Sequence, residues 1–398
     1  MPRRSEAKSG AGSAVRFFVY RSPMKKPNTS PAKATGRCAL EWIRPEIRAL
    51  RAYHVPEGQD LVKLDAMENP YPWPEGLVEK WLDTLRESAI NRYPDPSPEA
   101  LKGLLRKTMR IPDGMGVLLG NGSDELIQLI AMSMQGSRRD KPRVILAPEP
   151  TFVMYRLIAM ACGLEFVGAP LRAADFSLDG GTVLDAIEKH QPAVVFLAYP
   201  NNPTGNLFDT ELLLAILAQA PGLVVIDEAY TPFAQTSRME WLRDWPNLII
   251  LRTLSKLGFA GLRLGFAVGH PEWMEEMNKL RLPYNINTLT QASVSLALDH
   301  FAVFEEQITR IRQGREKLFR ALSAREGVTA WPSRANFILF RPASKSADAI
   351  HAGLRKRGIL IKNLHGSHPL LENCLRVTVG MPEENQAFLE AFGIVGVK

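Results

Sequence analysis

Cysteine is scarce in this chain, whose 398 residues include only Cys38, Cys162 and Cys374. Three widely separated cysteines cannot build a disulfide framework, and none belongs to a Cys-x-x-Cys pair of the kind that holds zinc. The histidines also lack the spacing to acidic residues or cysteines that recurs in metal sites. We therefore expect no bound metal ion and a reducing compartment, the cytoplasm.

Long apolar runs are also missing. The longest of them, such as 194–198 and 222–226, fall well short of the roughly 20 residues that a membrane-spanning helix needs. Yet 45% of the residues are apolar, and a chain of 44.3 kDa with this share can bury more than one average core. The sequence therefore excludes a peptide and a wholly disordered chain, and it predicts no membrane partner.

Positive charge is in excess over the whole chain, with a net charge of +7, but it is concentrated at the N-terminus. Residues 1–37 contain nine lysines and arginines and one acidic residue, so the remaining residues carry a net charge of −1. A nearly neutral body gives no basis for expecting a nucleic-acid partner. The tail at 1–37 is rich in Pro, Ser, Lys and Arg without apolar periodicity, which predicts disorder, and Met24 is an alternative start.

Short apolar runs alternate with helical patterns from residue 38 onward, which predicts an α/β fold. We expect strands at 117–119, 143–147, 165–167, 193–198, 223–227, 248–252 and 264–268. Helices are expected between them at 124–134, 152–162, 182–189 and 210–219. Most of these strands are apolar throughout, which is typical of a sheet that helices cover on both faces.

A smaller domain is expected after a long helical region at 288–325. Its strands are predicted at 337–340, 360–362 and 375–379, and its helices at 347–357 and 383–392. We divide the chain into the tail at 1–37, an N-terminal segment at 38–90 that joins the small domain, a large domain at 91–285 and the small C-terminal domain at 286–398.

Polar residues gather at the ends of the middle strands, where open α/β sheets bind their ligands. The first such end reads Gly-Asn-Gly-Ser at 120–123 and opens a helix. Glycines let the backbone approach an anion, and the free N–H groups of a helix start can hold a phosphate. Alone, this turn is weak evidence, because many ordinary helices begin in the same way.

Three further strand ends carry more specific motifs. They are Asn-Asn-Pro-Thr-Gly at 201–205, Asp-Glu-Ala-Tyr at 227–230, and Ser-Lys at 255–256 followed by Arg263. In order and spacing, over roughly residues 40 to 395, these motifs resemble the fold type I pyridoxal-phosphate-dependent aminotransferases. The resemblance implies a large, mixed and mostly parallel sheet domain that is flanked by helices and binds pyridoxal 5'-phosphate, with a smaller α+β domain.

The residue types in these motifs suit that chemistry. A lysine amine forms a Schiff base with an aldehyde, and a conjugated pyridinium ring absorbs the electrons released when an α-proton leaves; Lys256 is the candidate lysine. The ring nitrogen must stay protonated, and a buried carboxylate such as Asp227, at the end of an apolar run, keeps it so. The resemblance adds Tyr230 as the third catalytic residue and assigns the ring's phenolic oxygen to Asn202 and Tyr230.

The cofactor phosphate needs backbone amides and cationic donors. Phe152 falls where the family stacks an aromatic ring on the cofactor. The cofactor-binding residues that the resemblance implies are Gly122, Ser123, Asp124, Phe152, Asn202, Asp227, Tyr230, Ser255, Lys256 and Arg263, together with Tyr93 from a partner subunit.

Five segments narrow the resemblance. They are similar to the histidinol-phosphate aminotransferases at residues 64–70, 91–96, 122–125, 282–285 and 374–380. Members of that family exchange an amino group between L-histidinol phosphate and 2-oxoglutarate, giving imidazole acetol phosphate and glutamate in histidine biosynthesis.

The same resemblance implies a homodimer with shared active sites, in which Tyr93 reaches the partner's cofactor phosphate. It also places Tyr53, Lys362 and Arg376 around the phosphate of the substrate. Two positions depart from the family pattern: Met67 stands where the motif has an asparagine, and Lys362 stands where arginine is common. Lysine keeps the charge but loses the two-pronged grip of a guanidinium.

Two other functions stay open, and a third lacks a module that it would need. An aromatic or broad-specificity aminotransferase, and a decarboxylase of the same fold that acts on a phosphorylated amino acid, would share the cofactor site. A regulator that uses this body as a sensor would need a DNA-binding module, and residues 1–37 have neither the length nor the helical periodicity to form one.

Overall fold

The computed structural model describes residues 42–50, 58, 60–138 and 141–396. The predicted disordered tail at 1–37 and Tyr53 lie outside the described residues. The first described element is the short helix α1 (Pro45–Ala49). The compact unit Ala49–Lys398 carries both of the large sheets.

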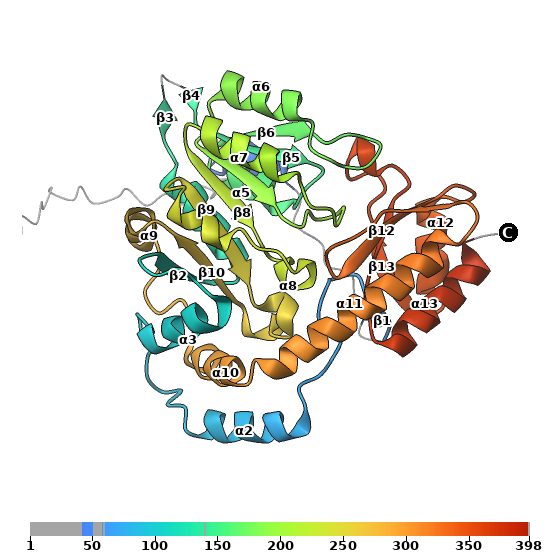
Figure 1. Cartoon of the computed structure of the whole chain (residues 1–398), viewed down its shortest axis with the longest axis horizontal. Coiled ribbons are helices and arrows are strands. Elements are labelled where there is room, and N and C mark those ends of the chain that lie inside the picture. Colours follow the sequence, from blue (N-terminus) through green and yellow to red (C-terminus); the bar gives the residue numbers. More distant parts are fainter. Residues whose placement is uncertain (1–41, 51–57, 59, 139–140, 397–398) are drawn as a thin grey trace, which may run out of the picture. The chain divides into compact units, whose positions relative to one another are not determined.

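A seven-stranded sheet is the centre of this unit, with the strand order β2-β10-β9-β8-β7-β5-β6 (Figure 1). All neighbouring strands in it are parallel except at β10, which runs antiparallel to β2 and β9. Its strands are β2 (Gly116–Asn121), β5 (Val144–Glu149), β6 (Glu165–Pro170), β7 (Val194–Ala198), β8 (Leu223–Asp227), β9 (Leu248–Thr253) and β10 (Leu264–Gly269). All seven predicted strands of the large domain are therefore confirmed.

Helices cover the central strands on both faces, and successive side chains of each strand point to opposite faces. Val224 and Ile226 of β8 pack into one core, while Val225 between them packs into the other. Helices α4 (Ser123–Ser133), α5 (Met154–Ala161) and α9 (Pro271–Asn278) contribute to the second core. Helices α6 (Gly180–His190) and α7 (Thr210–Gln219) contribute to the first.

A five-stranded sheet follows, in the order β1-β13-β14-β12-β11. Its strands are β1 (Val62–Leu64), β11 (Val328–Ala330), β12 (Phe337–Pro342), β13 (Ile359–Asn363) and β14 (Leu375–Thr378). Helices α12 (Ala347–Arg355) and α13 (Pro382–Val395) lie beside it, and the long helix α11 (Ala302–Ser323) runs to it from α10 (Thr288–Asp299), as Figure 1 shows. Together with the large sheet, this arrangement confirms the predicted fold class.

The remaining elements are short or lie at the edges. Helices α2 (Glu75–Arg86) and α3 (Glu99–Met109) both pack against α10. The others are β3 (Ser137–Arg138), β4 (Lys141–Pro142), α8 (Thr231–Ala234) and the 3-10 turns η2 (Met239–Arg243), η3 (Ser255–Leu257), η4 (Ala260–Leu262) and η5 (Pro369–Leu371). No helix in the described part of the chain is long and apolar enough to cross a membrane.

Three features differ from the sequence-based expectation. The helical region predicted at 288–325 is interrupted at residues 300–301, where α10 ends and α11 begins. Strands β1 and β11 are not among the predicted strands; each is three residues long, too short for a period of two to be recognised. Within the predicted N-terminal segment, β1 pairs with β13, whereas α2 packs against α10. The predicted domain boundaries stay a prediction.

Candidate active site

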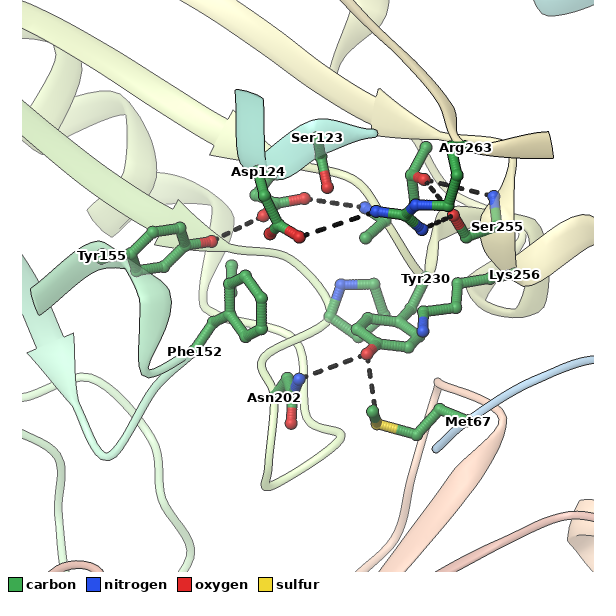
Figure 2. Close-up of a pocket in the computed structure, with 15 residues that line it drawn as sticks. Met67, Ser123, Asp124, Phe152, Tyr155, Asn202, Tyr230, Ser255, Lys256 and Arg263 are labelled. Atoms are coloured by element: carbon green, nitrogen blue, oxygen red, sulfur yellow. Dashed lines mark hydrogen bonds and ion pairs between the residues drawn. The ribbon is translucent and has the colours of Figure 1, made fainter. Parts of the chain in front are cut away.

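A cavity of about 120 Å³ lies at the carboxyl ends of the large sheet's strands. Figure 2 shows its labelled side chains converging from the loops after β7 and β8, the start of α4 and the turn that follows β9. The sequence-predicted residues that line it are Ser123, Asp124, Phe152, Asn202, Asp227, Tyr230, Ser255, Lys256 and Arg263. Residues from segments far apart in the sequence are thus brought to one place.

Asp227 ends β8 and lines this cavity. Its Oδ2 accepts a 2.7 Å hydrogen bond from the Tyr155 hydroxyl, and its Oδ1 accepts a 3.0 Å hydrogen bond from the backbone N–H of Ala229. Burial raises the pKa of Asp227 from 3.8 to about 6, although both donors favour the charged form. A cationic group that entered the cavity beside this carboxylate would therefore be held strongly.

Lys256 lies in η3, shortly after β9 ends. Its Nζ donates a 3.3 Å hydrogen bond to the carbonyl of Ala66 and lies 5.8 Å from the centre of the Tyr230 ring. Desolvation, followed by the positive charge of Arg376, lowers the pKa of Lys256 from 10.5 to about 8. A much larger share of this amine is therefore neutral and nucleophilic near neutral pH than for an exposed lysine.

The start of α4 and Arg263 form a site suited to an anion. Gly122 precedes α4 with φ 83°, and a Cβ atom there would lie 2.6 Å from Nη2 of Arg263, so only glycine fits. The guanidinium donates from Nη1 to Ser255 Oγ at 3.4 Å and lies 3.8 Å from Asp124 Oδ2. One end of the cavity thus holds the amides at the start of α4, the hydroxyls of Ser123 and Ser255 and the guanidinium of Arg263. These are the donors that a phosphate needs.

A chain of polar contacts leads out of the cavity. The Nδ2 group of Asn202 donates to the Tyr230 hydroxyl at 3.2 Å, and that hydroxyl donates to Sδ of Met67 at 3.2 Å (Figure 2). On its other side, Oδ1 of Asn202 accepts a hydrogen bond from Nη1 of Arg376 at 2.5 Å. Asn202 therefore links the tyrosine of the first cavity to an arginine of the small sheet.

A second, larger cavity of about 380 Å³ lies beside the first and shares Met67, Phe152 and Asn202 with it. Lys362 and Arg376 both line this second cavity. They are directly opposite each other in the antiparallel pair β13 and β14. The predicted convergence of these two cations is thus present, in the cavity beside the one that Lys256 lines.

Two predicted residues do not line either cavity within the described part of the chain. Tyr93 is 81% exposed and stacks on the ring of Tyr284, with centroids 4.5 Å apart. Gly122 lies next to the first cavity rather than in its lining. Tyr53 lies outside the described residues, so its predicted role is not placed.

Sequence reasoning missed several residues of the first cavity, of which Tyr155 is the most important. A buried tyrosine in a helix normally belongs to the core, and only its contact with Asp227 reveals more. In the sequence, the available signal for a role of Tyr155 in the site is its position one helical turn after Phe152. In the sequence Met67 stands out only as a departure from the family motif, yet it lines both cavities and has φ 55°, a backbone region that a non-glycine residue seldom adopts.

Comparison with known proteins agrees with this geometry. Residues 59–392 match the family Aminotransferase class I and II. The chain is 52% identical to histidinol-phosphate aminotransferase 2 of Nitrosococcus oceani over 88% of this chain and 96% of that protein. It is 53% identical to histidinol-phosphate aminotransferase 2 of Cupriavidus pinatubonensis, over 88% and 95% of the two chains.

A solved structure has the same fold. It is histidinol-phosphate aminotransferase from Sinorhizobium meliloti in complex with pyridoxal-5'-phosphate, with a TM-score of 0.77 and 24% identity over 91% of this chain and 98% of that one. The family resemblance that the sequence motifs indicated is thereby confirmed over most of the chain. The chain belongs to the Aminotransferase class I and II family.

Proposed function

We propose that this aminotransferase exchanges an amino group between L-histidinol phosphate and 2-oxoglutarate, giving imidazole acetol phosphate and glutamate in histidine biosynthesis. The observation that carries the proposal is the pair Lys362 and Arg376, which face each other across two strands in the cavity beside Lys256. Two cations in one place suit a phosphate dianion. The histidinol-phosphate aminotransferases that share about half of this sequence support the same substrate.

We further propose pyridoxal 5'-phosphate as the cofactor of the first cavity, because the donor set fits its ends. Bound there, it would supply an aldehyde carbon for amines and a ring that accepts electrons. Asp227 would hold a proton at the ring nitrogen, while Asn202 and Tyr230 would contact the phenolic oxygen. The phosphate would lie among the α4 amides, Ser255 and Arg263.

The roles of the remaining residues follow from their positions. Lys256, with its lowered pKa of about 8, would hold the cofactor and then carry a proton to and from the amino-bearing carbon of the substrate. Phe152 lines both cavities and would pack against the cofactor on one side and the substrate on the other. No histidine is required for this proton transfer.

We also propose that the chain acts as a homodimer in the cytoplasm. Stacking of Tyr93 on Tyr284 brings two surface segments together, and on them Ile90 is 76% exposed and Leu282 is 71% exposed. Apolar side chains exposed in this way favour a contact with a second copy. Tyr93 would then reach the partner's active site, as the family pattern implies.

The decisive experiment compares substrates with the purified protein. L-Histidinol phosphate is assayed with 2-oxoglutarate beside phenylalanine, tyrosine and threonine phosphate. We expect kcat/KM for histidinol phosphate to exceed the others by at least roughly tenfold, about 1.4 kcal/mol of discrimination. A smaller preference would favour the broad-specificity aminotransferase, and release of carbon dioxide from threonine phosphate would favour the decarboxylase.

A further inference from the structure

One end of the second cavity has no part in the proposed function so far. It extends from Lys362 and Arg376 past Glu149 at the end of β5 and Phe166 near the start of β6 to the loop after β13. Its walls are mainly apolar, with side chains that include Val153, Phe166, Leu364 and Leu371. Several polar side chains interrupt this apolar surface, among them Arg156, Glu149 and His368.

Glu149 ends β5, and its carboxylate is fixed in position. Arg156 donates to it twice, from Nε to Oε1 at 3.3 Å and from Nη2 to Oε2 at 2.6 Å. The guanidinium of Arg156 lies in turn over the ring of Phe166, 4.4 Å from its centre. Since a carboxylate has about four lone-pair positions, Glu149 can accept a further hydrogen bond from a ligand.

The neighbouring strand leaves room for this carboxylate only because it has a glycine there. A Cβ atom on Gly168 of β6 would lie 2.0 Å from Oε2 of Glu149. The Glu149 side chain is only 19% exposed, so it has little space to withdraw. The position of the Glu149 carboxylate at the cavity wall therefore depends on both strands, on β5 for the residue itself and on β6 for the glycine beside it.

His368 presents the opposite kind of group. Its Nδ1 accepts a 3.1 Å hydrogen bond from the backbone N–H of Leu370, so the ring proton is on Nε2. Burial lowers the pKa of His368, which keeps the ring neutral near neutral pH. The histidine thus offers a single N–H donor in a cavity where Glu149 offers an acceptor.

We propose that Glu149 and His368 form the subsite for the substrate's side chain and select an uncharged heteroaromatic ring with one N–H and one ring acceptor, an imidazole. A neutral imidazole needs one acceptor and one donor at its two nitrogens, with apolar surfaces along its faces. A phosphate is a poor occupant of this end, because the positive charge of Arg156 there is already balanced by the carboxylate of Glu149. The assignment rests on the proposed function, which puts the phosphate at Lys362 and Arg376 and the amine at Lys256.

This subsite also accounts for discrimination against aromatic amino acids. A benzene ring has the right shape but cannot donate to Glu149 or accept from His368. A site built to pair with polar groups disfavours analogues that lack them, because Nε2 of His368 then has no acceptor in the ligand and Glu149 keeps only Arg156 as a donor. The subsite therefore separates a histidinol-phosphate enzyme from a broad-specificity aminotransferase.

The test compares L-histidinol phosphate with L-phenylalaninol phosphate, which has the same amine and phosphate but a phenyl ring. Three variants disturb the subsite in different ways. Glu149→Gln removes the charge, Gly168→Ala displaces the carboxylate without removing it, and His368→Ser removes the ring donor while keeping a capping oxygen for η5. Gly103→Ala in α3, where a Cβ atom meets nothing within 4 Å, is the matched control.

We expect all three variants to lower kcat/KM for histidinol phosphate. The loss should be roughly tenfold or more for Glu149→Gln and Gly168→Ala, the range of a hydrogen bond to a charged group, and severalfold for His368→Ser. The values for phenylalaninol phosphate and for glutamate should change less than about twofold. Dissociation constants from calorimetry should follow the same order.

The proposal is overturned if the ratio of the two ring substrates is unchanged in all three variants. It is equally overturned if every substrate, glutamate included, loses the same factor, because the residues then serve the fold. Failure of the unmodified protein to use histidinol phosphate at all would instead overturn the proposed function. Because Gly168→Ala leaves Glu149 and Arg156 intact, the inference stays testable even if Glu149→Gln does not fold.

Discussion

The hydroxyl of Tyr155 donates a 2.7 Å hydrogen bond to Oδ2 of Asp227, and both side chains are buried. The contact joins α5 to the end of β8 across 72 positions of the sequence. It favours the charged form of a carboxylate whose pKa burial would otherwise raise further. Tyr155 is therefore a positioning residue that acts on the site through Asp227.

Replacing Tyr155 by Phe should weaken cofactor binding at mildly acidic pH. The ring also stacks on Phe196, with centroids 4.6 Å apart, so the variant should keep its packing and lose only the hydrogen bond. The pKa of Asp227 then rises, and the carboxylate becomes charged only at higher pH. Affinity for pyridoxal 5'-phosphate at pH 6 should fall roughly 2- to 12-fold, as expected for about 0.5–1.5 kcal/mol.

Fluorescence titration of the cofactor against pH would measure this effect. Tyr199→Phe is the control, since Tyr199 is also buried but bonds to Arg238 outside the cavity. If Tyr155→Phe and Tyr199→Phe give the same pH dependence, Tyr155 has no special part in the site.

Asp227→Asn should raise the stability of the cofactor-free protein while lowering its activity. Because the folded-state pKa of Asp227, about 6, lies above its unfolded value of 3.8, the unfolded chain loses this proton first. The group therefore lowers the stability of the cofactor-free protein as the pH rises from 3.8 to about 6, and the loss is complete above that range. At pH 7.5, cofactor-free Asp227→Asn should be more stable than the unmodified protein, by on the order of 1 to 3 kcal/mol.

The same variant should nevertheless lose activity. An amide cannot hold a ring nitrogen protonated as a carboxylate does, so kcat should fall at least ~10³-fold, about 4 kcal/mol of barrier. Urea unfolding of the cofactor-free protein and steady-state kinetics measure the two effects. A loss of activity below roughly tenfold would mean that the ring nitrogen has another charge partner.

Much of this site could be expected from the sequence because its residues follow apolar strands. The run 223–227 reads as a strand buried on both faces, which places Asp227 at the sheet's carboxyl edge. Lys256 could be placed in the same way, in the turn that follows β9. In both cases the local pattern of the chain fixes where the side chain must be.

Other parts of the site depend on contacts that no local pattern contains. The distance between Glu149 and Gly168 is set by the pairing of β5 with β6, whereas a glycine within a strand is equally typical of a bulge or a bend. The break between α10 and α11 falls at His300 and Phe301, neither of which is a helix breaker. Tertiary packing decides such features, and it becomes visible only in three dimensions.

Lys256→Ala should abolish the covalent attachment of the cofactor. The absorbance of the lysine-bound cofactor in the visible range should be lost, and borohydride should no longer fix the cofactor to the protein. Lys279→Ala, at an exposed position just after α9, is the control. Peptide mapping of the reduced, unmodified protein gives the direct answer, since a label on any other lysine would refute the assignment.

The pH at which the cofactor attaches should depend on Arg376. Its positive charge is the second cause, after desolvation, of the lowered pKa of Lys256, about 8. An amine is nucleophilic above its pKa, so attachment to the cofactor-free protein should rise with pH around 8. In Arg376→Gln the pKa of Lys256 should increase and the attachment profile should move to higher pH.

Stopped-flow measurement of the attachment rate would show this shift without any substrate. Arg376→Lys keeps the positive charge and should leave the profile nearly in place, although it loses the hydrogen bond to Asn202 that the guanidinium makes. Identical profiles for the unmodified protein and Arg376→Gln would show that desolvation alone sets the pKa of Lys256.

Lys362→Ala should change KM differently for the two amino donors, histidinol phosphate and glutamate. Lys362 faces Arg376 across the β13 and β14 pair, and both line the second cavity. Glutamate has no phosphate to lose, so KM should rise much more for histidinol phosphate, by roughly 10- to 150-fold, as expected for a charge-assisted hydrogen bond. Lys362→Arg should keep or improve the affinity, because a guanidinium can hold two phosphate oxygens at once. Steady-state kinetics with each donor at saturating acceptor measures both effects, and equal changes for the two donors would assign Lys362 to the fold or to a carboxylate that both reactions share.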